Sequence, residues 1–185
     1  NGTCNYQLIN NPIISVPVID VTRNITSNTT WTKNNIYAIN GRIFVESGVT
    51  LTIEPGTIIK GEAGTKTNAK ILIIAKGAKI DAKGTALEPI IFTSINDQIQ
   101  PGEIESNLGG LSIESSISRG QWGGLILLGD APVSSKNGGA SDNIEGLPGD
   151  ESLATYGGSN PNDNSGFLQY VSIRFGGIEI APGNE

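Results

Sequence analysis

Histidine and methionine are absent from this 185-residue sequence, and cysteine occurs only once. Histidine is the most common general base and a frequent metal ligand, so its absence excludes Ser-His and Cys-His catalysis within the chain. Cys4 has no second cysteine with which to form an internal disulfide. We expect it to be free, to pair with a segment outside this sequence or, as a third alternative, to carry a lipid anchor.

Basic residues and long apolar runs are also scarce. Lysine and arginine number 12 against 18 aspartates and glutamates, which gives a formal net charge of −6. A nucleic-acid surface needs clustered basic residues to displace counterions from phosphates, so we expect no nucleic-acid partner. No run of 18 apolar residues is present, and we therefore expect no transmembrane segment. No basic and apolar leader is recognisable, so any export signal is expected to lie outside this sequence.

Aromatic residues make up only 5% of the chain, whereas glycine occurs 25 times and proline 9 times. The apolar content therefore lies mostly in isoleucine, valine, leucine and alanine. This balance favours β-branched strands joined by tight turns over helices. The length suits one domain with a substantial core better than two small domains. We expect a single all-β domain.

Two stretches repeat the same alternation of apolar and polar side chains, residues 48–53 (GVTLTI) and residues 77–82 (GAKIDA). A period of two with one apolar face is typical of a half-buried strand. Aligning the leading glycines gives an offset of 77 − 48 = 29 residues and superposes Leu51 on Ile80. The segments that follow, EPGTIIKG and EPIIFTS, also match after a short insertion.

A repeat of this size, built from short strands and glycine turns, is typical of a solenoid. One unit cannot bury its apolar face alone. Coils stacked about 4.8 Å apart place the valine, isoleucine and leucine of one coil on those of the next. A β-sandwich also has alternating strands, but hairpin signals such as Asn-Gly between paired strands are largely missing here. We therefore predict a single-stranded parallel β-helix.

The pattern divides the chain into two regions. Residues 1–30 are polar and turn-rich and contain Pro17, so we predict an N-terminal cap or edge segment there. Residues 31–185 are predicted to form the coils, with polar insertions at about 96–121 and 134–166. Between the insertions, the apolar run WGGLILLGDAPV predicts a buried strand. Insertions in solenoids extend from one face and often form the binding surface.

Several segments together resemble a known family: IFVESGVTLTIEPGTIIKG, WGGLILLGDAPV, NIEGLPGDE, YGGSNPNDNSG and LQYVSIRFGGIEI. They are similar to secreted right-handed parallel β-helix proteins of Bacteroidota, over residues from about Thr30 to Glu185. The resemblance implies a right-handed helix, a place outside the cell or on its outer surface, and often a type nine secretion signal. Members of that family continue into further coils. The resemblance thus also implies an N-terminal portion whose open end is covered by missing coils or by another chain.

Acidic residues gather in the second insertion, which is rich in glycine and asparagine. Calcium takes six to eight oxygen ligands from carboxylates and carbonyls, so this loop is a candidate calcium site. The spacing lacks the D-x-D-x-D-G pattern of a calcium loop, and solvated surface charge is the alternative. The candidate ligands are Asp142, Glu145, Asp150, Glu151 and Asp163.

Four aromatic residues are candidates for stacking on sugar rings: Tyr156, Trp122, Trp31 and Tyr170. An aromatic side chain joins an apolar face to a polar edge, which suits the face of a pyranose. Tyr156 is followed by Gly157 and Gly158 in the second insertion, so we expect it to be the most exposed of the four. Core packing is the alternative for each, and Trp122 directly precedes the predicted buried strand.

No catalytic constellation is recognisable, so we predict no catalytic residue in this segment. Outward carboxylates such as Glu54 and Asp81 are interpreted as surface charge, because nothing fixes a pair for glycoside cleavage. The leading hypothesis is an extracellular cell-surface structural or binding module for adhesion or glycan binding, whose partner is a polysaccharide or another surface protein. One alternative is a polysaccharide lyase or glycoside hydrolase whose groove lies partly in missing coils. Another is a structural filament or surface-layer subunit.

Overall fold

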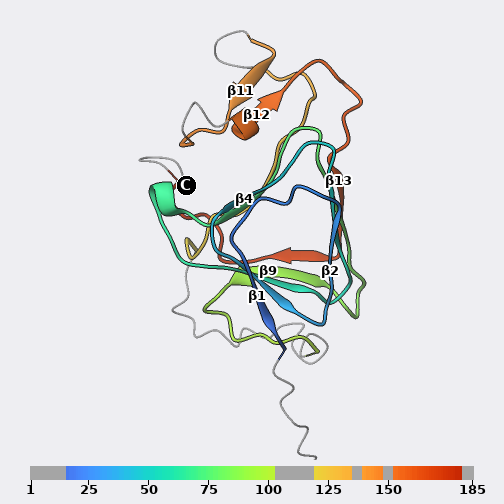
Figure 1. The fold of residues 1–185 in the computed structure, drawn as a ribbon, viewed down its shortest axis with the longest axis vertical. Helices are drawn as coiled ribbons and strands as arrows, with labels where there is room; N and C mark the ends of the chain where they lie inside the picture. The colour runs from blue at the N-terminus through green and yellow to red at the C-terminus, as the bar shows by residue number, and fades with distance from the viewer. Residues whose placement is uncertain (1–15, 103–118, 135–138, 148–151, 181–185) are drawn as a thin grey trace, which may run out of the picture.

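The chain winds through three parallel sheets, which it visits in the same order in successive turns. A computed structural model describes residues 16–102, 119–134, 139–147 and 152–180. Within these residues every strand pairing is parallel except that of one hairpin. Figure 1 shows the coils lying over one another around a common interior. The predicted parallel β-helix is confirmed, and an antiparallel sandwich is excluded.

The strands of each sheet come from successive coils. Sheet A contains, in spatial order, β1 (Val18–Val21), β3 (Ile36–Ile39), β6 (Ile58–Gly61), β9 (Ile90–Ser94) and β14 (Val171–Ile173). Sheet B contains β4 (Arg42–Val45), β7 (Ile71–Ile74) and β10 (Gly124–Leu127). Sheet C contains β2 (Thr29–Trp31), β5 (Thr50–Ile53), β8 (Lys79–Lys83) and β13 (Gly166–Gln169).

The remaining described elements are short. They are the 3-10 helices η1 (Lys66–Asn68) and η2 (Ser152–Ala154) and the hairpin strands β11 (Ser141–Asn143) and β12 (Thr155–Gly157). In the part of the chain that the structure covers, no helix has the length and apolarity needed to cross a bilayer.

The register between β5 and β8 is the one that the sequence repeat predicts. Leu51 pairs with Ile80, and Ile53 pairs with Ala82, so the offset is 80 − 51 = 29 residues. Strands β6 and β9 also pair, which places the EPGTIIKG and EPIIFTS segments in successive coils. Because parallel strands keep the same side-chain phase in register, each coil places its apolar residues over those of the coil before it.

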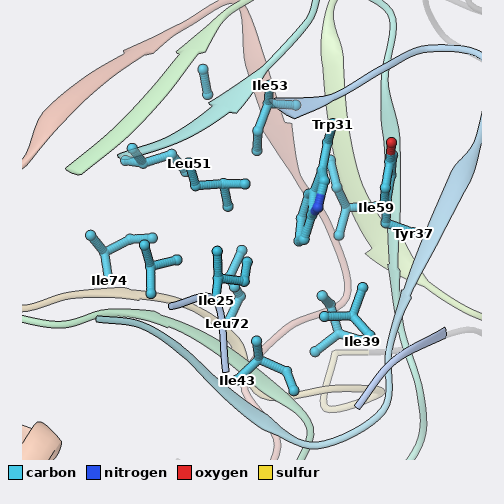
Figure 2. Packing of buried hydrophobic residues seen from close by; sticks show 14 of the residues in the cluster. Ile25, Trp31, Tyr37, Ile39, Ile43, Leu51, Ile53, Ile59, Leu72 and Ile74 are labelled. Carbon is cyan, nitrogen blue, oxygen red and sulfur yellow. The ribbon is translucent and has the colours of Figure 1, made fainter. Parts of the chain in front are cut away.

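Apolar side chains fill the interior of the coils (Figure 2). Leu51, Leu72 and Ile74 point into it and are fully buried. Burying one such side chain stabilises the fold by about 1.5–3 kcal/mol relative to leaving it exposed. In the first two coils the rings of Trp31 and Tyr37 stack, with 4.6 Å between their centroids. The core is therefore a continuous column that runs from coil to coil.

Glycines turn the chain between sheets B and C. Gly48 and Gly77 occupy equivalent corners of successive coils, with φ of +80° and +79°. The Gly48 amide donates to the Gly77 carbonyl at 2.9 Å. A positive φ is open to glycine without steric penalty, so the two glycines that mark the sequence repeat also shape its corner.

The first coil begins earlier than the predicted boundary. Strand β1 lies at the edge of sheet A, as expected for an edge segment, but β2 runs across residue 30. Val21 and Ile25 are buried in the shared core, and Ile25 forms a parallel bridge with Val45. Residues 18–30 are thus part of the helix. Pro17 precedes β1 and therefore removes no donor from its hydrogen-bond ladder.

The outer faces of the three sheets differ in what covers them. On sheet A, Ile99 packs on outward isoleucines such as Ile36 and Ile58. On sheet B, the second insertion covers outward residues such as Phe44 and Ile73. On sheet C, the outward residues are polar apart from one, and no described segment packs across them. Among the described residues, the second insertion and the uncovered outer face of sheet C are therefore candidate ligand-binding surfaces.

Candidate functional site

The second insertion builds a hairpin beside the end of β10. After β10 ends at Leu127, the chain forms the antiparallel pair β11 and β12, in which Asp142 lies opposite Tyr156. Figure 1 shows this hairpin projecting from the stacked coils. Gly157 ends β12 with φ +80°, and an added Cβ would lie 2.7 Å from the Ala140 carbonyl oxygen. Only glycine fits at this crossing.

Polar contacts tie the base of the hairpin to two coils. The Gly157 amide donates to the Gly129 carbonyl at 2.8 Å, and the Lys76 ammonium donates to the Gly157 carbonyl at 3.2 Å. The same ammonium lies 3.4 Å from a carboxylate oxygen of Asp130. Asp163 in turn accepts a hydrogen bond from the Asp130 amide at 3.0 Å. The hairpin is therefore held both at the corner after β7 and at the end of β10.

Apolar side chains of the insertion pack on the outer face of sheet B. Leu147 and Ala154 are buried there, and Ile144, Leu153 and Tyr156 are partly buried. This packing explains why β7 is apolar at every position, since Ile71 and Ile73 face the insertion while Leu72 and Ile74 face the core. The Tyr156 side chain therefore packs on one side against this apolar cluster.

A cleft of about 470 Å³ lies between β10 and the hairpin. Tyr156, predicted from the sequence to stack on a sugar, and Glu145, predicted as a calcium ligand, both line this cleft. The other lining residues are almost all apolar or glycine: Ile126, Leu127, Leu128, Gly129, Ala131, Val133, Ile144, Gly157 and Ile180. An apolar concavity with few polar groups is the usual form of a site that takes a small molecule or one unit of a polymer.

The two tryptophans lie elsewhere. Trp31 is 3% exposed and Trp122 is fully buried, so neither ring has an open face for a sugar. The Trp122 indole donates to the Arg174 carbonyl at 2.8 Å and occupies space that an added Cβ on Gly61 would take. For both residues the structure supports the core-packing alternative, because each ring fills the interior of a coil.

The predicted calcium ligands are not gathered into one site where they are described. The Asp142 carboxylate accepts from the Asn143 amide on β11, and Asp163 accepts from Asp130 at the base of the insertion. Among the described residues, no group of three His, Cys, Asp or Glu side chains is placed to hold a metal ion. Asp150 and Glu151 lie outside the described residues, so calcium binding stays a prediction.

One exposed aromatic residue was not among the candidates predicted from the sequence. Phe167 lies at an outward position of β13 and is 56% exposed on the polar face of sheet C. The Lys83 ammonium lies 4.6 Å from the centre of its ring. Alternation gave no signal here, because Phe167 and Leu168 are adjacent apolar residues in GFLQ and either could point outward. Because β13 follows directly after the long second insertion, the first residue of this strand could not be located from the sequence.

Comparison with curated proteins and with solved structures finds no match. Comparison with protein families finds the pectate-lyase-like β-helix domain, which matches residues 23–185. This match covers β2 to β14, and its β-helix description agrees with the stacked parallel coils. The chain therefore belongs to the family of pectate-lyase-like β-helix domains.

Proposed function

We propose that this chain is an extracellular cell-surface module that binds polysaccharide through the cleft beside Tyr156 and performs no catalysis itself. The observation that carries the proposal is a supported aromatic ring that lines an apolar cleft on a projecting insertion. The family description supports a polysaccharide as the ligand, because it relates this domain to pectate lyase. The fold alone does not fix an activity, so the cleft itself has to be tested.

The chemistry of the cleft suits one sugar unit. The apolar C–H face of a pyranose can stack on the Tyr156 ring, and such aromatic contacts contribute about 0.5–1.5 kcal/mol beyond the buried area. Glu145 lies in the same wall and presents a carboxylate to ligand hydroxyls. Charged acceptors form stronger hydrogen bonds than neutral ones, so this group would orient the sugar.

Binding of the full chain to immobilised polysaccharides tests the proposal. Tyr156→Ala removes the ring and is expected to weaken binding about fivefold, whereas Tyr156→Phe keeps the ring and most of the affinity. The unfolding midpoint of each variant shows whether the hairpin is retained. Unchanged affinity in a folded Tyr156→Ala protein would rule out the cleft. Release of soluble oligosaccharides by the chain would contradict the non-catalytic role.

The cell-surface location is part of the proposal and has a separate test. Protease added to intact cells that express the natural protein is expected to degrade it. A cytoplasmic protein of the same cells serves as the protected control. Protection of both proteins to the same extent would contradict a surface location.

A further inference from the structure

The outer face of sheet C is an ordered array of side chains. In register across β2, β5, β8 and β13, the outward residues Thr30, Thr52, Asp81 and Phe167 form one rank. Four rungs separated by about 4.8 Å give this rank a length of roughly 14 Å. Neighbouring ranks add Thr50 beside Lys79 and Lys83 beside Gln169. The face thus combines hydroxyl, amide, carboxylate and ammonium groups with one aromatic ring.

Phe167 is the exception on this face. A phenylalanine on an otherwise polar surface gains little from burial when 56% of it is exposed. The ring is nevertheless held in place, since the Lys83 ammonium lies over it at 4.6 Å and is itself 2.9 Å from an Asp81 oxygen. Cation–π contact with an ion-paired lysine fixes one side of the ring.

A second exposed aromatic residue follows closely. Tyr170 is 54% exposed at the corner between β13 and β14. Its backbone is fixed, because its carbonyl accepts from the Ile90 amide at 3.0 Å and the preceding Gln169 carbonyl accepts from Gly84 at 2.8 Å. Two aromatic side chains are therefore exposed on rigid backbone within one short stretch of the last described coil.

The charges of this face argue for an uncharged ligand. Lys83 is paired with Asp81, which leaves Lys79 as the one cation of the face without an ion pair among the described residues. The chain as a whole carries a net charge of −6, which repels a polyanion. Threonine, glutamine and aspartate side chains donate to and accept from hydroxyls without requiring charge on the ligand.

We propose that the outer face of sheet C is a second binding site, which takes an extended uncharged polysaccharide. Phe167 stacks on a sugar ring, Tyr170 provides a second contact, and the ranks of threonine, Asp81 and Gln169 bind the hydroxyls. This site is separate from the cleft beside Tyr156, because it lies on another sheet. It deepens the proposed function by naming the ligand class, and it does not depend on the cleft.

Affinity electrophoresis of the full chain in gels that contain hydroxyethyl cellulose, xyloglucan or polygalacturonate tests this site. Phe167→Ala is expected to lower the affinity for at least one of the two uncharged polymers by about fivefold to tenfold, and Phe167→Trp to restore it. Val18→Ala is the matched control, because Val18 is an equally exposed apolar residue on sheet A and its loss should change nothing. Unfolding midpoints confirm that each variant is folded.

Three results would overturn the second site. The first is a folded Phe167→Ala protein that binds the uncharged polymers as the parent does. The second is binding to polygalacturonate alone that disappears with added salt, since that would identify a polyanion ligand. The third is the absence of binding to any of the three polymers. If Tyr156→Ala abolishes binding while Phe167→Ala has no effect, only the second site fails and the cleft stands.

Discussion

At the scale of single residues, the corner glycines show how backbone conformation fixes a coil. Gly48 and Gly77 share the same left-handed conformation one coil apart. They differ in their surroundings. An added Cβ on Gly48 meets nothing within 4 Å, whereas on Gly77 it would lie 2.5 Å from the Ser47 hydroxyl. The pair therefore separates the cost of conformation from the cost of crowding.

We predict that Gly48→Ala lowers the free energy of unfolding by about 1 kcal/mol, because alanine is disfavoured at positive φ. Gly77→Ala should cost about 1 kcal/mol more, because the hydroxyl of Ser47 must move. Adding Ser47→Ala to Gly77→Ala should remove the difference. Urea unfolding measures all three proteins, and equal losses for the two glycine variants would show that Ser47 does not crowd the corner.

An exposed ion pair links the first and third coils at the corner between sheets C and A. The Lys33 ammonium donates to the Glu88 carboxylate. This hydrogen bond, together with the charge of Glu88, raises the pKa of Lys33 above its ordinary value of 10.5. A raised pKa means that the contribution to stability is complete below 10.5 and is lost as the pH rises through the higher folded value.

Glu88→Gln should therefore lower the pKa of Lys33 towards 10.5, because both the charge and the strongest acceptor are lost. An NMR titration of the lysine side-chain signals at alkaline pH measures this shift. A Lys33 pKa that is the same in both proteins would contradict the assigned pair.

At the scale of elements, the hairpin of β11 and β12 is attached to the coils by apolar packing and by a small number of polar contacts. Lys76 is central to them, because it bonds to Gly157 and pairs with Asp130. Its side chain is 39% exposed, so solvent screening limits its contribution to less than about 1 kcal/mol. The effect of removing it should therefore be local.

We predict that Lys76→Met leaves the global unfolding midpoint nearly unchanged but speeds amide hydrogen exchange in β11 and β12. The free energy of local opening depends on the contacts between the hairpin and the coils, and the variant lacks those made by the Lys76 ammonium. Lys79→Met removes a lysine from the outer face of sheet C and is the matched control. Exchange in the hairpin that is equally fast in both variants would mean that Lys76 does not hold it.

The elements differ in how far the sequence could predict them. Strands β5 and β8 alternate cleanly because their outer face is bare, so their phase and pairing were predictable. Strand β7 is apolar throughout because the second insertion covers its outer face, and its phase could not be read from the pattern alone. The burial of Trp122 depends on the absence of a side chain at Gly61, which no local pattern reveals.

The residues of the candidate sites also differ in how far the sequence could predict them. Tyr156 was predictable as a candidate because two glycines follow it in a polar insertion, and the structure places it at the wall of the cleft. Phe167 was not, because its partners Asp81 and Lys83 precede it by more than 80 residues. Side chains that a solenoid brings together across an insertion share no signal in the sequence.

At the scale of the whole molecule, the number of residues in each coil varies, whereas the register between paired strands is kept. Along sheet C the offsets between paired residues are 51 − 29 = 22, 80 − 51 = 29 and 166 − 80 = 86 residues. The last interval is long because both insertions lie within it. The repeat was therefore visible only between β5 and β8, and the later coils had to be inferred from composition and resemblance.

In the last described strands, apolar residues still occupy the inward positions that line up with the core of the preceding coil. Leu127, Leu168 and Ile173 pair with the buried residues Ile74, Ala82 and Phe92, and they are exposed on the side away from these strands. A further rung stacked on this coil would bury them in the same column.

Disulfide trapping tests the stacked register most directly. In a Cys4→Ser background, Thr50→Cys with Lys79→Cys joins residues that are paired across β5 and β8 and point outward. Their Cα atoms are separated by one rung of about 4.8 Å, within the range of a disulfide. Thr50→Cys with Asp81→Cys is the mismatched control, because two residues of shift along the strand raise the separation to about 8 Å. We predict rapid oxidation of the first pair and little of the second. Equal oxidation of both pairs, or of neither, would contradict the parallel coils.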